Sequence, residues 1–118
     1  MPVIYDLRSA LAMLEQLPGQ LLQTDEPVDP NADLAGIYKL IGAGGTVERP
    51  TRTGPAMIFN NVKGYADARV LVGLMASRER VAALLGAPAE ELGIYLGKAV
   101  RNPIPRYWWK INRGYVRK

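Results

Sequence analysis

The sequence predicts an α/β (α+β) domain in which helices pack against a small mixed sheet, and three observations support this prediction. Apolar residues recur at helical spacing in four segments of the chain. Two apolar runs of strand length, Ala56–Val62 and Ala68–Leu74, flank a turn around Lys63-Gly64. Helical and strand-like segments alternate, which is typical of mixed architectures. With 118 residues, 48% of them apolar and 22% charged, the chain is long enough for one modest core.

The first part of the chain predicts a helix, a short strand and a second helix. Asp6 is a suitable N-cap for the first helix, and Pro18-Gly19 ends it. Residues 20–24 are a short strand candidate. The second helix should begin after Asp29-Pro30-Asn31 and end at the glycine cluster of residues 42–45. The apolar residues expected to face the core are Leu7, Leu11, Leu14 and Leu17 in the first helix and Leu34, Ile37, Tyr38 and Ile41 in the second.

After an exposed loop predicted at residues 46–55, the two strands are followed by two further helices. Ser77 caps the first of these and Gly86 closes it. Pro88 opens the last helix, which Asn102-Pro103 ends. The side chains expected to point inward are Val81, Leu84 and Leu85 in the first, and Leu92, Tyr95, Leu96 and Ala99 or Val100 in the second.

The composition excludes several classes of chemistry. The chain has no cysteine, so disulfides and thiolate catalysis are excluded. It has no histidine, which removes imidazole metal ligands and nucleophiles activated by histidine. No apolar run approaches the roughly 20 residues that a membrane-spanning helix needs, and no signal-peptide pattern opens the chain. We therefore expect a cytoplasmic protein.

Three short motifs could carry chemistry, and each has a structural alternative. The 42–45 glycine cluster lacks both dinucleotide-fingerprint and P-loop spacing, which favours a helix C-cap over a phosphate site. The acid pair Asp25-Glu26 is predicted at a turn, and the pair Glu90-Glu91 at a helix start. Two carboxyl groups can act as acid and base only if burial separates their pKa values, and nothing in the sequence indicates that either pair is buried. The string Asn60–Gly64 could orient a carboxylate or phosphate, but a turn stabilised by an asparagine side chain is favoured. No catalytic, cofactor-binding or metal-ligating residue is predicted.

Positive charge is concentrated at the end of the chain. Residues 101–118 contain six basic residues and no acid, whereas the first 100 residues carry nine basic and eleven acidic residues. The string Arg106-Tyr107-Trp108-Trp109-Lys110 combines cations with aromatic rings, as surfaces for single-stranded nucleic acid or anionic membranes do. The alternative function from this observation is a small protein that binds nucleic acid or a membrane surface through its tail. An extension without a fold of its own is favoured over it.

An ordered set of strings resembles the beginning of UbiD-family decarboxylases. It begins with Asp6-Leu7-Arg8, Gly19-Gln20-Leu21-Leu22, Val28-Asp29-Pro30 and Asp33-Leu34-Ala35, and continues with residues 54–64 (GPAMIFNNVKG) and 72–81 (VGLMASRERV). No single string is decisive, but their order and spacing are specific, and they cover residues 3–105. Within the family, the chain resembles the large subunit of bacterial hydroxybenzoate, vanillate or gallate decarboxylases.

The resemblance implies a UbiD-type N-terminal domain at residues 1–105, with residues 106–118 as a basic aromatic tail outside the family fold. It implies non-oxidative decarboxylation of aromatic acids by the full-length enzymes, which use prenylated FMN with manganese and potassium. Those groups bind in a domain that follows this one, so no site residue is carried over. The partners implied are an aromatic carboxylic acid for the full-length enzyme, and a homo-oligomer or a partner decarboxylase subunit.

The departure from the family after Pro105 predicts a truncated chain that is inactive alone. The codons for Arg-Tyr-Trp-Trp-Lys-Ile can also be read in a shifted frame that begins at the third base of the Arg106 codon. In that frame they encode an aliphatic residue, then Leu-Val-Glu, then Asp or Asn. Such a string would suit a strand entering the next domain. The hypothesis is that the tail is out of frame, and the alternative is a genuine short variant.

Overall fold

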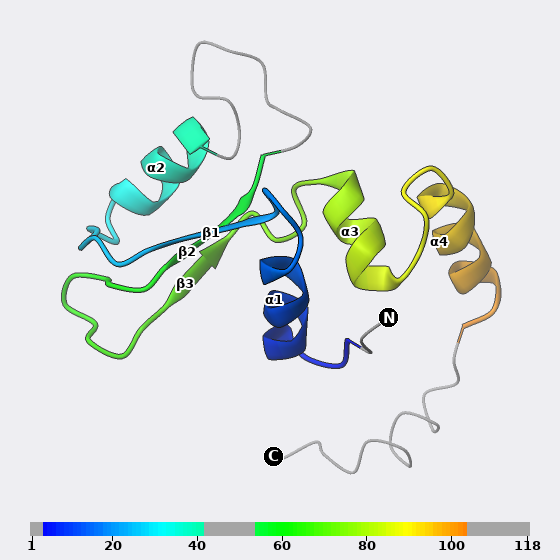
Figure 1. Cartoon of the computed structure of the whole chain (residues 1–118), viewed down its shortest axis with the longest axis horizontal. Helices are drawn as coiled ribbons and strands as arrows, with labels where there is room; N and C mark the ends of the chain where they lie inside the picture. Colours follow the sequence, from blue (N-terminus) through cyan, green and yellow to red (C-terminus); the bar gives the residue numbers. More distant parts are fainter. Residues whose placement is uncertain (1–3, 42–53, 104–118) are drawn as a thin grey trace.

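The computed structural model describes residues 4–41 and 54–103, and within these ranges the chain forms four helices and a three-stranded sheet (Figure 1). The elements in order are α1 (Leu7–Glu15), β1 (Leu21–Thr24), α2 (Asp33–Ile41), β2 (Ala56–Phe59), β3 (Val70–Val72), α3 (Arg78–Leu85) and α4 (Leu92–Arg101). The predicted α+β class with a small mixed sheet is confirmed. The predicted glycine cap at 42–45, residues 46–53 of the predicted loop and the 106–118 tail lie outside the described residues.

The sheet has the order β1-β2-β3, with β2 at its centre. β1 runs parallel to β2, with Leu21 opposite Ala56, and β3 runs antiparallel to β2, with Val72 opposite Met57. β2 and β3 are both shorter than the runs Ala56–Val62 and Ala68–Leu74 that predicted them. Beyond Phe59 the chain leaves the ladder, and Val62 forms only isolated bridges to Val28 and Tyr65.

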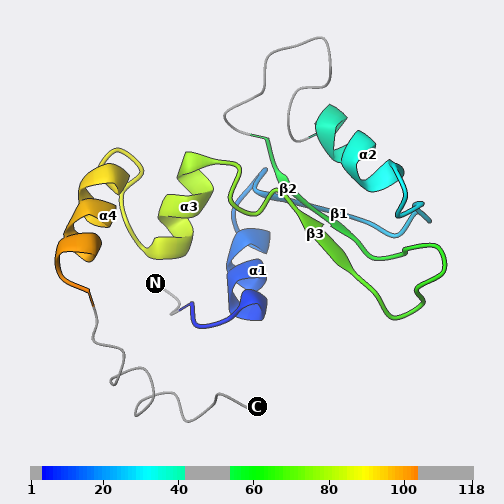
Figure 2. The same cartoon turned by 180° about the vertical axis from the view of Figure 1, so that it is seen from behind.

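The main core lies on the face of the sheet that α2 covers (Figures 1 and 2). Its buried members are Val28, Met57, Phe59 and Val62, and Leu34, Ile37, Tyr38, Val70 and Val72 pack against them. All four residues of β2 are buried, which is expected of a central strand covered on both faces. The inward positions predicted for Leu34, Ile37 and Tyr38 are confirmed, whereas Ile41 is exposed because it is the last residue of α2.

The helix boundaries follow the local signals closely. Asp6 caps α1 in a capping box with Ser9, whose backbone N donates to Asp6 Oδ1 at 2.8 Å. Ser77 caps α3, and Gly86 ends it in the left-handed conformation. The helix predicted to open at Pro88 starts instead at Leu92, because a separate turn comes first, in which the Glu91 N–H donates to the Pro88 carbonyl.

Some predictions of which side chains point inward are wrong. In α1 the buried residues are Ala10 and Leu14; Leu7 is exposed, and Leu17 is exposed because the helix ends before it. In α3 the buried residues are Arg80 and Ala82, and Leu85 is exposed. In α4 only Leu92 is buried, whereas Tyr95, Leu96, Ala99 and Val100 are exposed. No helix among residues 4–41 and 54–103 is long and apolar enough to cross a bilayer.

Candidate functional site

The most strongly bound polar side chain in the described structure is Arg80, which projects from the first turn of α3 and is completely buried. All five N–H donors of its guanidinium are used. Nε donates to the Leu74 carbonyl at 2.8 Å; Nη1 donates to the Gln20 carbonyl at 3.4 Å and to Gln20 Oε1 at 3.0 Å; Nη2 donates to the carbonyls of Gly54 at 3.1 Å and Gly73 at 2.8 Å. The charge is thus solvated by oxygen dipoles from three separate segments.

The electrostatics of this cluster are consistent with a structural role. Burial lowers the pKa of Arg80, and nearby Tyr38 and Glu79 act in the opposite direction. Arginine nevertheless stays charged in proteins because its ordinary pKa lies so high. Because no donor is left over, Arg80 has nothing to offer a ligand anion. It joins the α1–β1 junction, the start of β2 and the end of β3 to α3.

A second polar cluster lies where β1 and β2 end side by side. Asn60 Nδ2 donates to Asp25 Oδ1 at 2.9 Å and to Gln23 Oε1 at 3.4 Å, while Asn60 Oδ1 accepts from Arg69 Nε at 2.7 Å. Asn61 Nδ2 donates to the Asp25 carbonyl at 3.2 Å. Both amides therefore tie strand ends together. Gly64 has the positive φ expected of the turn, but the asparagines bind residues far along the chain rather than neighbouring backbone.

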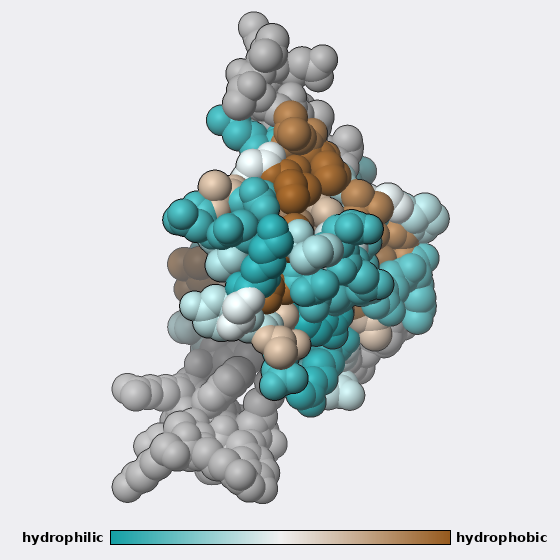
Figure 3. All heavy atoms as spheres, turned by 90° about the vertical axis from the view of Figure 1, so that its left-hand side faces the viewer, coloured by the Kyte–Doolittle hydropathy of each residue, from teal (hydrophilic) through white to brown (hydrophobic). Residues whose placement is uncertain are grey.

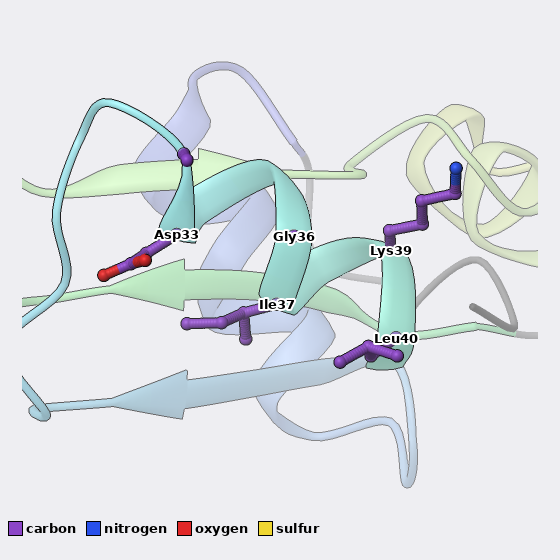
Figure 4. A pocket seen from close by; sticks show the side chains of 6 residues that line it. Asp33, Gly36, Ile37, Lys39 and Leu40 are labelled. Atoms are coloured by element: carbon purple, nitrogen blue, oxygen red, sulfur yellow. The ribbon is translucent and has the colours of Figure 1, made fainter. Parts of the chain in front are cut away.

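A hollow of about 470 Å³ runs beside α2 (Figure 4). It is lined by Ala32, Asp33, Gly36, Ile37, Lys39 and Leu40. Asp33 accepts a hydrogen bond from the Asp29 backbone N at 2.8 Å, and Lys39 points away from it. Figure 3, which views the α2 side, shows apolar surface here, and Leu40 is 71% exposed. The polar side chains that line the hollow, Asp33 and Lys39, point in different directions, so the hollow does not form an acid–base site.

The acid pairs do not form a catalytic arrangement within the described residues. Asp25 and Glu26 are both exposed, and Asp25 is bound by Asn60. Glu90 and Glu91 are exposed in the turn before α4. Residues 4–41 and 54–103 contain no group of three or more histidine, cysteine or acidic residues that could hold a metal ion. Among the described residues, no donor set therefore fits the manganese that the resemblance implies.

Sequence reasoning missed Arg80 as a central residue. It stands within the string of residues 72–81, and an arginine in a helical pattern ordinarily indicates a solvated position. One signal could have found it: Arg80 is on the same helix face as Ser77 and Leu84, so the helix turns it toward the domain.

Comparison with known proteins identifies the fold. Residues 12–100 match the family described as the 3-octaprenyl-4-hydroxybenzoate carboxy-lyase N-terminal domain. The chain belongs to the UbiD N-terminal domain family. Among curated proteins, gallate decarboxylase of Lactiplantibacillus plantarum is 55% identical over 100 residues, which are 85% of this chain and 20% of that protein.

Solved structures of larger enzymes contain a similar fold. 3,4-Dihydroxybenzoic acid decarboxylase from Klebsiella pneumoniae matches with a TM-score of 0.77 and 61% identity, over 86% of this chain and 21% of that one. A UbiD-class enzyme from Pelotomaculum thermopropionicum, solved in complex with prFMN, matches with a TM-score of 0.69 and 34% identity, over 84% of this chain and 20% of that one. The UbiD-type domain described here thus spans about one fifth of the length of these relatives.

Proposed function

We propose that this chain is the N-terminal, non-catalytic part of a UbiD-type decarboxylase of hydroxylated aromatic acids, and that these 118 residues are inactive alone. The observation that carries the proposal is the 61% identity, at a TM-score of 0.77, to a 3,4-dihydroxybenzoic acid decarboxylase. A gallate decarboxylase at 55% identity supports the same substrate class, a benzoate bearing ring hydroxyls.

The domain's contribution is positional. Arg80 connects four segments through buried hydrogen bonds, and the Asn60–Asp25 pair fixes the ends of β1 and β2. Such connections support a rigid wall against which a catalytic domain can be placed. Prenylated FMN, with manganese and potassium, binds to the remaining part of a full-length enzyme, and this cofactor supplies the electron sink for decarboxylation. The full-length enzyme works in the cytoplasm. The chain then assembles either with copies of itself, as a homo-oligomer, or with a decarboxylase subunit that carries this remaining part.

A domain exchange tests the proposal. The matching part of the Klebsiella 3,4-dihydroxybenzoic acid decarboxylase is replaced by residues 12–100 of this chain, and carbon dioxide release from 3,4-dihydroxybenzoate, gallate and vanillate is measured. We expect a rate within about tenfold of the parent, because the catalytic groups are untouched.

The control is the same enzyme carrying an unrelated α/β domain of similar size in that place, for which we expect no turnover. A chimera that elutes like the parent in gel filtration and retains cofactor, but releases no carbon dioxide from any of the three acids, would contradict the proposal.

A further inference from the structure

The apolar surface of α4 continues beyond what the domain itself covers. Leu92 at its start is 7% exposed, Leu96 one turn later is 44% exposed, and Val100 in the last turn is 80% exposed. Figures 1 and 2 show α4 at the end of the molecule farthest from α2. Helix faces that are apolar along their whole length normally pack against another element. The outer two turns of α4 have no such element among the described residues.

Two glycines make this face flat. With 100° per residue, Gly93, Leu96, Gly97 and Val100 lie within about 100° of the helix circumference. A Cβ built on Gly93 would meet no heavy atom of the described residues within 4 Å, and one on Gly97 would meet only Arg101 Nη2, at 3.6 Å. Glycine inside a helix is destabilising relative to alanine. Nothing in the described part of the domain requires these two glycines, so their cost points to a neighbour outside it that approaches the backbone closely.

The length of the relatives indicates what that neighbour is. The family match ends at residue 100, in the last turn of α4, and the matched region is only 20–21% of the decarboxylase relatives. The open face therefore lies where the N-terminal domain of a relative joins the other four fifths. Arg101 stands beside it, with Nη2 3.6 Å from a Cβ built on Gly97, so a partner surface with an acidic group at its rim would complement it.

We propose that the α4 face formed by Gly93, Leu96, Gly97 and Val100 is the docking surface for a helix in the remaining part of a UbiD-type decarboxylase chain. This inference rests on the proposed function. A ridge of side chains from the partner helix would fit over the two glycines, while Leu96 and Val100 would be buried at its sides. The interaction fixes the angle at which the N-terminal domain meets the rest of the enzyme.

Hydrogen–deuterium exchange of the α4 amides tests the proposal, in the intact 118-residue chain and in the Klebsiella chimera described above. We expect exchange at least about tenfold slower in the chimera, because docking suppresses local opening. Gly93→Ala and Gly97→Ala should raise the melting temperature of the 118-residue chain by about 4 °C each. In the chimera the same substitutions should return α4 exchange to the fast rate, because the added methyl group holds the partner helix away.

Gly36→Ala is the matched control, since Gly36 is also a helical glycine with open space at its Cβ but lies on α2. It should stabilise both proteins and leave α4 exchange in the chimera unchanged. Equal α4 exchange in chimera and isolated chain would overturn the proposal. A dimer of the 118-residue chain that Gly97→Ala dissociates would also overturn it, because a second copy would then cover the face. Slow α4 exchange in the isolated chain that becomes fast when residues 104–118 are deleted would overturn it as well, because the chain's own tail would then cover the face. Because exchange is measured independently of turnover, a protected but inactive chimera would contradict the proposed function and not the docking surface.

Discussion

Arg80 shows how a single residue can organise this domain through hydrogen bonds to segments that are distant in the sequence. Its five hydrogen bonds go to oxygens of Gln20, Gly54, Gly73 and Leu74, all contributed by chain segments other than its own helix. A buried charge is tolerated only when its hydrogen-bonding groups are satisfied, and here the guanidinium and the carbonyls satisfy one another. Removing the side chain would take the guanidinium donors from the Leu74 and Gly54 carbonyls, whereas the Gln20 and Gly73 carbonyls also accept from the backbone N–H groups of Ala56 and Ala76.

Arg80→Lys is therefore expected to destabilise the protein by about 3 kcal/mol, because an ammonium group has three donors and cannot reproduce the planar five-donor fork. Urea unfolding followed by circular dichroism measures this. Arg78→Lys is the control: Arg78 is exposed and its Nε makes a single bond to the Ala89 carbonyl at 2.9 Å, so we expect a loss below about 1 kcal/mol. Equal effects of the two substitutions would contradict the structural role of Arg80.

Gly73 is a position where both backbone and space require glycine. Its φ is +75°, and a Cβ there would overlap the ring and hydroxyl of Tyr38, whose Oη is buried without a hydrogen-bond partner among the described residues. We expect Gly73→Ala to cost about 3 kcal/mol, the sum of left-handed strain and overpacking. Gly64, with φ +84° and open space around it, separates the two effects. Gly64→Ala should cost about 1 kcal/mol. A smaller loss at Gly73 than at Gly64, in thermal or urea unfolding, would show that the Tyr38 contact is unimportant.

At the scale of elements, local capping determines where helices begin and long-range packing determines which faces are buried. Asp6 and Ser77 both cap through bonds to residues three positions on. The buried residues of α1 and α3, by contrast, include an alanine each and, in α3, an arginine, which the apolar pattern of these helices does not indicate.

The Asp6 cap predicts a pH dependence. Hydrogen bonds from the Ser9 backbone and side chain lower the pKa of Asp6 below the ordinary value of an aspartate. A carboxyl group with a lowered folded-state pKa contributes stability that is fully present above its unfolded pKa and lost as the pH falls through the folded value. Asp6→Ala should therefore lower the melting temperature at pH 7, and the difference from the wild type should shrink as the pH is lowered from 4 toward 2. A difference that stays constant over that range would show that the Asp6 charge is not involved.

At the scale of the whole molecule, the described residues form a scaffold without a converging set of reactive groups. The Asp25, Asn60 and Arg69 side chains are bound to one another, Arg80 is saturated, and the α2 hollow is bordered by one acid and one lysine that point apart. Decarboxylation of an aromatic acid needs an electron sink and a positioned proton donor. We attribute both to the part of the decarboxylase relatives that this chain does not match.

The purified 118-residue chain is accordingly expected to be colourless, to bind neither FMN nor prenylated FMN at micromolar concentrations, and to release no carbon dioxide from vanillate, 4-hydroxybenzoate or gallate. Absorbance after gel filtration with added flavin, and headspace carbon dioxide, are the measurements. The Klebsiella enzyme under the same conditions is the positive control. A yellow protein that keeps flavin through the column would overturn this expectation.

The sequence by itself determined the features that depend on neighbouring residues. Asp6, Ser77 and Gly86 delimit helices, Gly64 makes its turn, and the three strands lie where the apolar runs predict them. These follow from hydrogen bonds and backbone preferences that span at most about four residues, which a single sequence displays directly.

Only the tertiary structure decided what depends on distant partners. Arg80 binds Gly54, 26 residues away, and Gln20, 60 residues away; Asn60 binds Asp25, 35 residues away. An arginine or asparagine has the same local pattern whether it is solvated or buried, because the free energy of burial depends on which oxygens the fold brings to it. For the same reason, the apolar spacing of Leu92, Leu96 and Val100 in α4 predicted that all three side chains are buried. Within the described residues only the first of them, Leu92, is covered.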